Sequence, residues 1–191
     1  MIGKGYKMNI FKKVKKQNGR RQIYFCGIKV FSYKRNRKKE SGTISKSAVF
    51  KIHGKIQIAS SAEIKEGVIL QNGSGQIIKI GNYTQLNPYV VLYGGNISIA
   101  DNCMIGPHVM IVTADHDFIQ TEKPMRFAGS INSGDLEIQE DVWIGANATI
   151  CSGCHKIGKG AVIGANSVVK NDIPDYAVSV GIPAKVIKYR K

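Results

Sequence analysis

A six-residue period in branched aliphatic side chains runs through most of this chain and limits the folds that it can adopt. The runs are Ile52, Ile58, Ile64 and Leu70; Ile80, Leu86 and Leu92; Ile99, Ile105 and Ile111; Ile138, Ile144 and Ile150; and Ile157, Ile163 and Val169. A period of six matches neither the turn of an α-helix nor the plain alternation of a strand. It matches a solenoid of short strands with a corner every six residues, in which the aliphatic side chains point inward and stack on their equivalents in neighbouring coils.

The period also divides the 191 residues into segments. We expect a basic N-terminal extension at 1–42 and a solenoid domain at 43–175, which a loop at 112–137 interrupts. Residues 176–191 are then a C-terminal segment that packs on the solenoid. Three faces give about 18 residues per coil, so residues 52–169 supply about five to six coils.

The pattern of an aliphatic residue, a glycine and four further residues, as in Ile144-Gly145 and Ile163-Gly164, resembles the hexapeptide-repeat acyltransferases. The closing block VVKNDIPDYAVSVGIPAKVI is more specific, because it resembles the end of the maltose/galactoside and polysaccharide-biosynthesis O-acetyltransferases. The resemblance covers about residues 50–188. It implies an all-β protein, a left-handed parallel β-helix with a protruding loop and a basic N-terminal extension. The left hand comes from the resemblance alone, since it breaks the usual crossover rule.

The six-residue period stops after Ile111 and resumes at Ile138, and a long loop in a compact repeat protein is often functional. The segment VTADHD in this loop resembles the family's short segment that ends in a catalytic histidine. The resemblance therefore implies that His116 is a general base, which takes the proton of an attacking hydroxyl. Asp115 and Asp117 flank it where the family usually has threonine and proline. We expect both on the acceptor side, where either acid could orient the imidazole.

The resemblance also implies a donor, an oligomer and further site residues. The donor is acetyl-CoA, and the oligomer is a homotrimer in which each site takes residues from two chains. Asn87 in QLNPYVV lies on the acceptor side, and Trp143 in DVWIG lies near both the acceptor and the coenzyme. The residues that match coenzyme-binding positions are Trp143, Ala146, Ala165, Lys170 and Lys185. The two lysines suit a polyphosphate as positive point charges.

No metal site is expected. Cys151 and Cys154 have the spacing of a zinc ligand pair, but the second pair that a structural zinc site needs is absent. A γ-type carbonic anhydrase shares the expected fold and needs three histidines on zinc. Here His108 and His116 are eight positions apart and have no third histidine nearby, which argues against that enzyme. The sequence also lacks a P-loop and a strand–GxGxxG–helix unit, which argues against phosphoryl or hydride transfer.

The formal net charge of +15 is concentrated at the N-terminus, where residues 1–40 hold 14 Lys/Arg and one acid. Residues 8–16 read as a short amphipathic helix, and residues 23–33 are apolar and β-prone. Basic residues interleaved with aromatic ones favour an anionic membrane surface as a partner, whereas nucleic acid is not expected. No apolar run is long enough to span a bilayer, and four cysteines suit a reduced cytoplasm. We therefore expect a cytoplasmic protein that can attach to the inner face of the membrane.

These observations predict an acetyl-CoA-dependent O-acetyltransferase. The acceptor is a sugar hydroxyl in a surface polysaccharide or in its lipid-linked or nucleotide-linked precursor. Three alternatives stay open: an N-acetyltransferase that acts on an amino sugar, a serine O-acetyltransferase, and a non-catalytic basic scaffold that binds nucleic acid or membrane. The long N-terminal helical domain of serine acetyltransferases is not found in the sequence. An amine acceptor also needs a base, so His116 does not discriminate between O-acetylation and N-acetylation.

Overall fold

The computed structural model describes residues 11–15, 20–25, 28–34, 42–132 and 134–190. The chain divides into two compact units, Met1–Lys39 and Glu40–Lys191. No helix among the described residues is long and apolar enough to cross a membrane.

The first unit contains a three-stranded antiparallel sheet in the order β1-β2-β3. Its strands are β1 (Phe11–Lys15), β2 (Arg20–Phe25) and β3 (Ile28–Lys34). The prediction of a helix at 8–16 is therefore wrong for 11–15, and its other positions lie outside the described residues. An isolated helix of nine residues is marginal in water, so pairing with a neighbouring strand decides the conformation.

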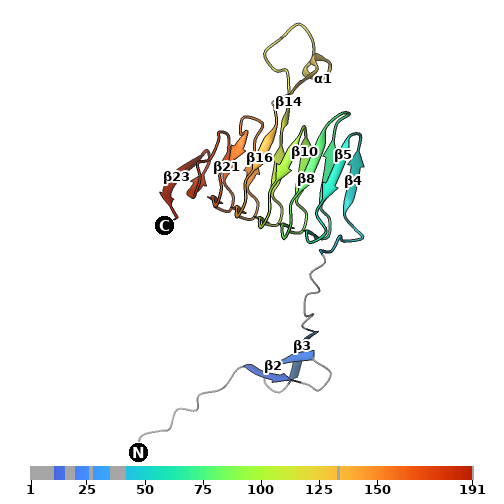
Figure 1. Ribbon diagram of the computed structural model, residues 1–191, viewed down its shortest axis with the longest axis vertical. Coiled ribbons are helices and arrows are strands. Elements are labelled where there is room, and N and C mark those ends of the chain that lie inside the picture. Colours follow the sequence, from blue (N-terminus) through green and yellow to red (C-terminus); the bar gives the residue numbers. More distant parts are fainter. Residues whose placement is uncertain (1–10, 16–19, 26–27, 35–41, 133, 191) are drawn as a thin grey trace, which may run out of the picture. The chain divides into compact units, whose positions relative to one another are not determined.

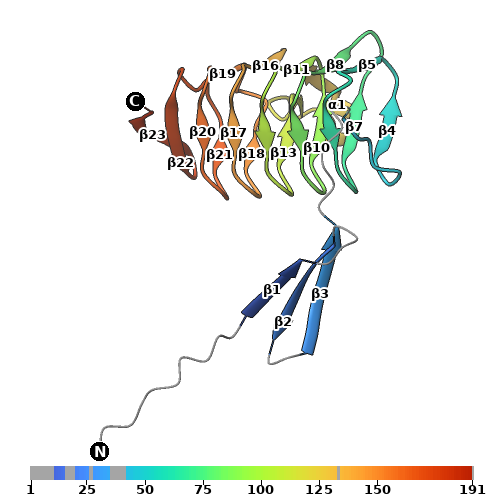
Figure 2. The same ribbon diagram turned by 60° about the horizontal axis from the view of Figure 1, so that its bottom comes forward.

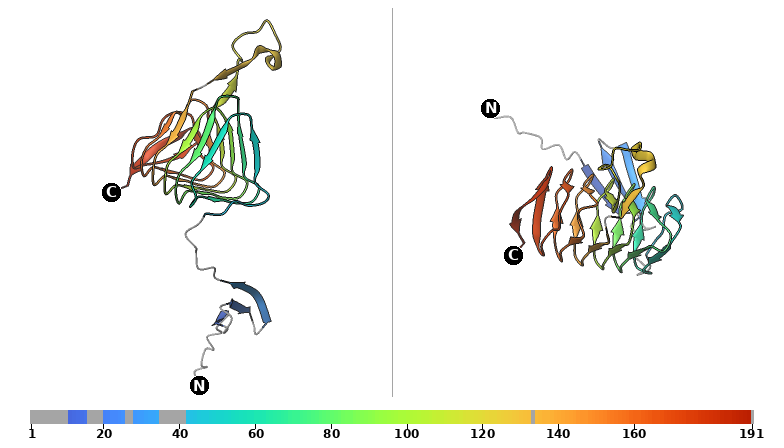
Figure 3. Two further views of the ribbon diagram at one scale, coloured as in Figure 1. Left: turned by 45° about the vertical axis from the view of Figure 1, so that its right-hand side comes forward. Right: turned by 90° about the horizontal axis from the view of Figure 1, so that it is seen from above.

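The second unit is a solenoid with three faces, each of them a sheet that runs along the stack (Figures 1 and 3). Face 1 consists of β4 (Val49–Ile52), β7 (Ile69–Asn72), β10 (Val91–Gly94), β13 (Met110–Val112), β18 (Thr149–Ile150) and β21 (Val168–Val169). Face 2 consists of β5 (Lys55–Ile58), β8 (Ile77–Ile80), β11 (Ile97–Ile99), β16 (Leu136–Ile138) and β19 (Lys156–Ile157). Face 3 consists of β6 (Glu63–Ile64), β9 (Gln85–Leu86), β12 (Met104–Ile105), β17 (Trp143–Ile144), β20 (Val162–Ile163), β22 (Ala177–Gly181) and β23 (Ala184–Tyr189).

Neighbouring strands of a face are parallel, except β23, which is antiparallel to β22 (Figure 2). The predicted all-β parallel β-helix is thereby confirmed. The C-terminal strands extend face 3, since β22 pairs with β20.

The core is a set of stacked aliphatic side chains. Leu92 pairs with Leu70 on one side and with Ile111 on the other, and all three are fully buried. Almost every residue in the six-residue runs is buried in this way, but Ile52 is 49% exposed. Ile52 pairs with Asn72 at the end of the first strand of face 1, while Phe50 takes the inward place opposite Leu70.

Two coils are nineteen residues long (92 to 111, and 144 to 163) rather than the predicted 18, and an earlier coil is 22 residues long (70 to 92). The extra residue lies at the corner from face 1 to face 2, where Leu92 precedes Ile99 by seven and Ile150 precedes Ile157 by seven. We call this corner the loop corner, because the interrupting loop leaves the stack there. The corner from face 3 to face 1 keeps the six-residue step and is called the narrow corner; it contains residues 87–89, 106–108, 145–147 and 164–166.

The loop projects away from the stack (Figure 1). It consists of β14 (Ala114–His116), α1 (Met125–Ala128) and β15 (Ser130–Asn132), and β14 and β15 form an antiparallel hairpin. Strand β13 ends at Val112 and β16 begins at Leu136, so the excursion covers residues 113–135.

Candidate active site

The loop leaves the solenoid at Thr113, which is 2% exposed. Its Oγ1 accepts a hydrogen bond of 2.6 Å from the buried backbone N–H of Gly95, and its own N–H donates to the Tyr93 carbonyl at 3.0 Å. Gly94 has φ +126°, and a Cβ there would lie 2.6 Å from the Thr113 hydroxyl. Glycine is therefore required beside the buried threonine, and together they fix the direction in which the loop departs.

His116 lies at the end of β14, opposite Ser130 of β15, and is exposed. Its backbone N–H donates to Oδ1 of Asp115 at 2.9 Å, and Oδ2 of Asp115 accepts a bond of 3.2 Å from the Ser152 hydroxyl. Oδ1 of Asp117 accepts the backbone N–H groups of Ile119 and Gln120, at 3.1 and 3.4 Å. The Asp115 carboxylate thus accepts hydrogen bonds from the backbone and from Ser152, and the Asp117 carboxylate accepts them from the backbone, rather than from the His116 ring.

A pocket of about 300 Å³ lies at the loop corner, next to the foot of the hairpin. It is lined by His53, Gln71, Asn72, Gly73, Gln76, Tyr93, Gly94, Ala114 and Ser130. Ala114 and His116 are two residues apart on one strand, so their side chains share a face of the hairpin. Ser130 is the cross-strand partner of His116. The pocket therefore opens beside the face of the hairpin that carries the imidazole.

The lining is polar and includes one imidazole, that of His53. Amides of Gln71 and Gln76 and the phenol of Tyr93 offer hydrogen-bond donors and acceptors, while carboxylates and ammonium groups are absent from the lining. Such groups suit the hydroxyls of a sugar, and the 43% exposed Tyr93 ring offers an apolar surface for the face of a pyranose.

These lining residues, His53 among them, were not predicted from the sequence. The spacing of the aliphatic residues could have indicated the pocket, since the steps from Phe50 to Ile58 and from Leu70 to Ile80 are longer than six residues. Both longer steps cross the loop corner, so an irregular step marked the part of the solenoid that is widened to form a pocket.

Asn87, Trp143, Ala146 and Ala165 gather elsewhere, on face 3 and at the narrow corner. Trp143 is outward-facing in β17 and 50% exposed. The backbone N–H of Asn166 donates to the Ala146 carbonyl at 3.0 Å, so Ala146 and Ala165 occupy equivalent corners of successive coils. Asn87 occupies the same corner two coils earlier, and its side-chain amide donates to the Ile105 carbonyl at 2.9 Å.

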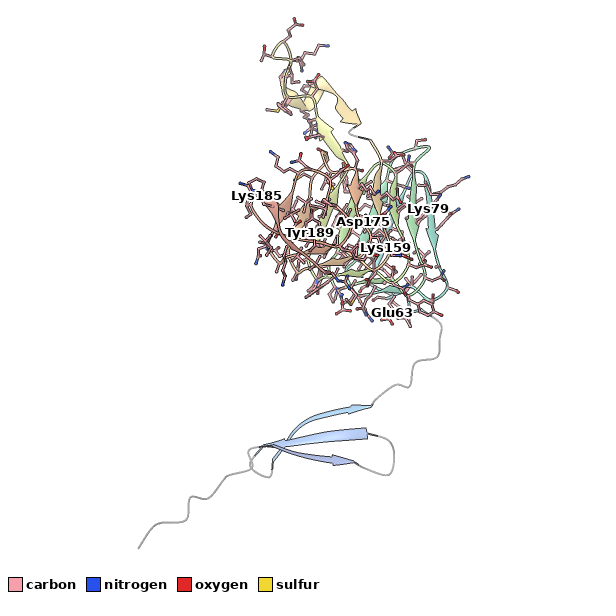
Figure 4. The ribbon with its side chains drawn as sticks, turned by 60° about the vertical axis from the view of Figure 1, so that its left-hand side comes forward. Glu63, Lys79, Lys159, Asp175, Lys185 and Tyr189 are labelled. Carbon is pink, nitrogen blue, oxygen red and sulfur yellow. The ribbon has the colours of Figure 1, made fainter. Side chains whose placement is uncertain are left out.

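The two lysines lie in further places. Lys170 directly follows β21 of face 1 and is exposed. Lys185 is in β23, opposite Val180, and Figure 4 shows it at the C-terminal end of the stack, with Lys79 towards the other end. Within one chain, His116 lies close to Asp115 and Asp117 on the loop. Trp143, Ala146 and Ala165 form a second group on face 3 and at the narrow corner, and the two groups lie apart.

The cysteines of the solenoid include two buried thiols. Burial raises the pKa of Cys103 to about 11 and that of Cys154 to about 12. Cys151 and Cys154 are free thiols. Within the described ranges, no group of three or more His, Cys, Asp or Glu residues could hold a metal ion.

Comparisons with known proteins identify relatives of this solenoid. Residues 135–171 match the family described as bacterial transferase hexapeptide (six repeats). The chain is 33% identical over 119 residues to the putative lipopolysaccharide biosynthesis O-acetyl transferase WbbJ of Escherichia coli, covering 59% of this chain and 60% of that protein. It is 34% identical over 131 residues to the galactoside O-acetyltransferase of Lactococcus lactis, covering 65% and 61%. The chain thus spans less than two thirds of the length of both curated relatives.

A solved structure matches a larger share of both chains. AntD, an N-acyltransferase from Bacillus cereus crystallised with dTDP-4-amino-4,6-dideoxyglucose and coenzyme A, superposes with a TM-score of 0.68 at 30% identity. The match covers 79% of this chain and 83% of AntD. AntD is therefore an acyltransferase that shares this solenoid and binds coenzyme A.

Proposed function

Because this chain belongs to the family of hexapeptide-repeat bacterial transferases, we propose that it is an acetyl-CoA-dependent O-acetyltransferase with a sugar acceptor. One observation carries the proposal: an exposed histidine ends a strand that also lines an uncharged polar pocket. The name of the WbbJ relative supports an acceptor in a surface polysaccharide or in its lipid-linked or nucleotide-linked precursor.

In the proposed reaction His116 is the general base. The acceptor sugar occupies the pocket, where Gln71, Gln76 and Tyr93 hold its other hydroxyls. The imidazole takes the proton as the hydroxyl oxygen attacks the thioester carbonyl. The carbon–sulfur bond then breaks, the acetyl group stays on the sugar, and the proton passes from the imidazolium to the departing thiolate.

The donor would bind along face 3 and the narrow corner. Ala146 and Ala165 have small side chains that leave the corner backbone accessible, and exposed Trp143 offers a flat surface to the pantetheine arm. Lys170 and Lys185 would meet the phosphates. Because Trp143, Ala146 and Ala165 lie on face 3 and at the narrow corner, whereas His116 lies on the loop that leaves from the loop corner, a complete site needs a second copy.

The outer surface of face 1 supports a homotrimer that would supply this copy. A row of uncharged side chains runs along it, made of Val49, Ile69, Val91, Met110, Thr149 and Val168. Val49 and Met110 are 42% and 39% exposed. A row of this kind, apolar except for Thr149, on the outside of a solenoid is suited to burial between subunits. Sedimentation equilibrium should give three times the 20.9 kDa chain mass.

N-acetylation of an amino sugar is the second candidate, and the AntD superposition favours it. A panel of acceptors separates the two activities, because an O-acetyltransferase releases coenzyme A with neutral sugars and an N-acetyltransferase requires an amino sugar. The cytoplasmic location and the attachment of residues 1–40 to an anionic membrane remain proposals, supported by the 14 Lys/Arg of that segment.

The test of the function is thiol release from acetyl-CoA with the sugar panel, for the natural protein and for His116→Ala. A general base contributes about 10²- to 10⁴-fold, so His116→Ala should lower kcat by that factor while acetyl-CoA still binds. Phe118→Ala, a 65% exposed residue of the same loop, is the matched control and should retain transfer. Retained transfer by His116→Ala would refute the proposed role.

A further inference from the structure

We propose that Asp115 is a positioning residue, and that Ser152 and His155 clamp the two limbs of the His116 loop to the next coil. We call Ser152 and His155 the loop clamp. Both belong to residues 151–155, the loop-corner segment that follows β18. The inference rests on the proposed function, because it assumes that His116 does the chemistry.

The outgoing limb is held through one carboxylate. Oδ1 of Asp115 accepts the His116 N–H at 2.9 Å, and Oδ2 of the same group accepts the Ser152 hydroxyl at 3.2 Å. The carboxylate therefore ties the backbone of the candidate base to a coil 37 residues further along the chain. Asp115 is two residues beyond the buried anchor Thr113, so the limb is fixed at two successive points.

The returning limb is held by the other member of the clamp. Nδ1 of His155 lies 3.4 Å from the Asp135 carbonyl oxygen and can donate to it when it carries the proton. Asn96 donates to the Asp135 carboxylate at 2.9 Å. Gly134 has φ +99°, and a Cβ there would lie 3.2 Å from the His155 ring, so the ring packs closely on this limb.

The clamp is itself fixed to the solenoid. The backbone N–H groups of His155 and Lys156 donate to Oδ1 of Asp172 at 2.7 and 2.9 Å. Cys154, between the clamp residues, is 1% exposed and anchors the segment in the core. A corner that is joined to the core at its middle and at its end can position a hairpin that projects into solvent.

The experiment compares kcat and KM for Asp115→Ala, Ser152→Ala and the double variant. Because a misplaced catalytic group costs up to about 10²-fold, Asp115→Ala should lower kcat about 10- to 100-fold and Ser152→Ala about 3- to 10-fold. KM for acetyl-CoA should not change. The double variant should be no slower than Asp115→Ala alone, since both changes break one connection. Ser152→Thr, which keeps the hydroxyl, should restore most of the lost kcat.

Ser61→Ala is the matched control, because Ser61, like Ser152, is a half-buried corner serine. Its hydroxyl takes part in two hydrogen bonds, and it lies away from the loop. Its kcat should equal that of the natural protein. Hydrogen exchange gives a readout that does not depend on activity: the His116 amide should exchange faster in Ser152→Ala and unchanged in Ser61→Ala.

Unchanged kcat and unchanged exchange in Ser152→Ala would overturn the clamp, as would losses that multiply in the double variant. A different result, retained transfer by His116→Ala, would refute the proposed function. A result in which His116→Ala is inactive but Ser152→Ala behaves like the natural protein would leave the function standing and refute only the clamp.

Discussion

Replacing Thr113 with valine keeps the shape of a buried side chain and removes the acceptor of the bond from Gly95. The Gly95 N–H, now buried without a partner, costs about 1–3 kcal/mol. The new methyl group returns up to about 0.8 kcal/mol through burial. We therefore expect Thr113→Val to lower the free energy of unfolding by about 0.2–3 kcal/mol, which is at most about 12 °C in Tm for a domain of this size.

The assay is urea unfolding followed by circular dichroism, together with amide hydrogen exchange at residues 94–96 and 114–116. Since Thr113 anchors the departing limb, exchange should rise most in β14 and less in the distant coils near β20. The same limb carries His116, so Thr113→Val should also lower kcat.

Ser179→Ala is the control for the loss of a hydroxyl in the core. Ser179 is fully buried, and its hydroxyl has no hydrogen-bond partner among the described residues. Its removal should therefore be neutral or stabilising. If Thr113→Val and Ser179→Ala shift the unfolding free energy equally, the bond to Gly95 does not hold the loop exit and the reasoning is refuted.

Three further predictions concern the solenoid itself. Ile144→Ala, which opens a cavity in the stacked core, should cost about 2–5 kcal/mol in urea unfolding, whereas Ile52→Ala at a half-exposed site should cost under about 1 kcal/mol; equal costs would contradict the stacking. Burial raises the pKa of Cys154 to about 12, so iodoacetamide at pH 8 should modify Cys151 before Cys154, as read by mass spectrometry. The same raised pKa contributes stability that is complete below about pH 9 and is lost as the pH rises towards 12, so urea unfolding should show a stability that falls over this range.

The period of six was sufficient to predict the faces, the stacking and the interruption, because each of these is a property of one coil and its neighbours. Ile52 is an exception to this prediction. At the end of the stack the register is set by the pairing of Phe50 with Leu70, which the spacing alone does not reveal. The steps of seven residues were visible in the sequence as irregularities. Only the structure shows that they fall at one corner, the corner where the loop leaves.

The short helix expected at 8–16 failed for a different physical reason. Local periodicity of apolar residues gives a helix and a strand similar support over so short a segment, and the pairing of β1 with β2 decides between them. The pocket was missed for a third reason. Gln71, Gln76 and Tyr93 come from two coils and meet Ala114 only because the corner widens there, so their proximity depends on the stack.

The division of the candidate site between two corners follows from the core of the solenoid. Stacked residues such as Leu92, Ile105 and Ile144 fill the space between the three faces, and all three are fully buried. A residue on face 3 and a residue at the loop corner are therefore separated by packed side chains, and no change in loop conformation removes them. Sequence spacing reports positions along one chain, so it cannot test the proposal that a base from one copy faces a donor site on another. For this reason the assembly, more than any single side chain, decides whether the proposed chemistry can occur.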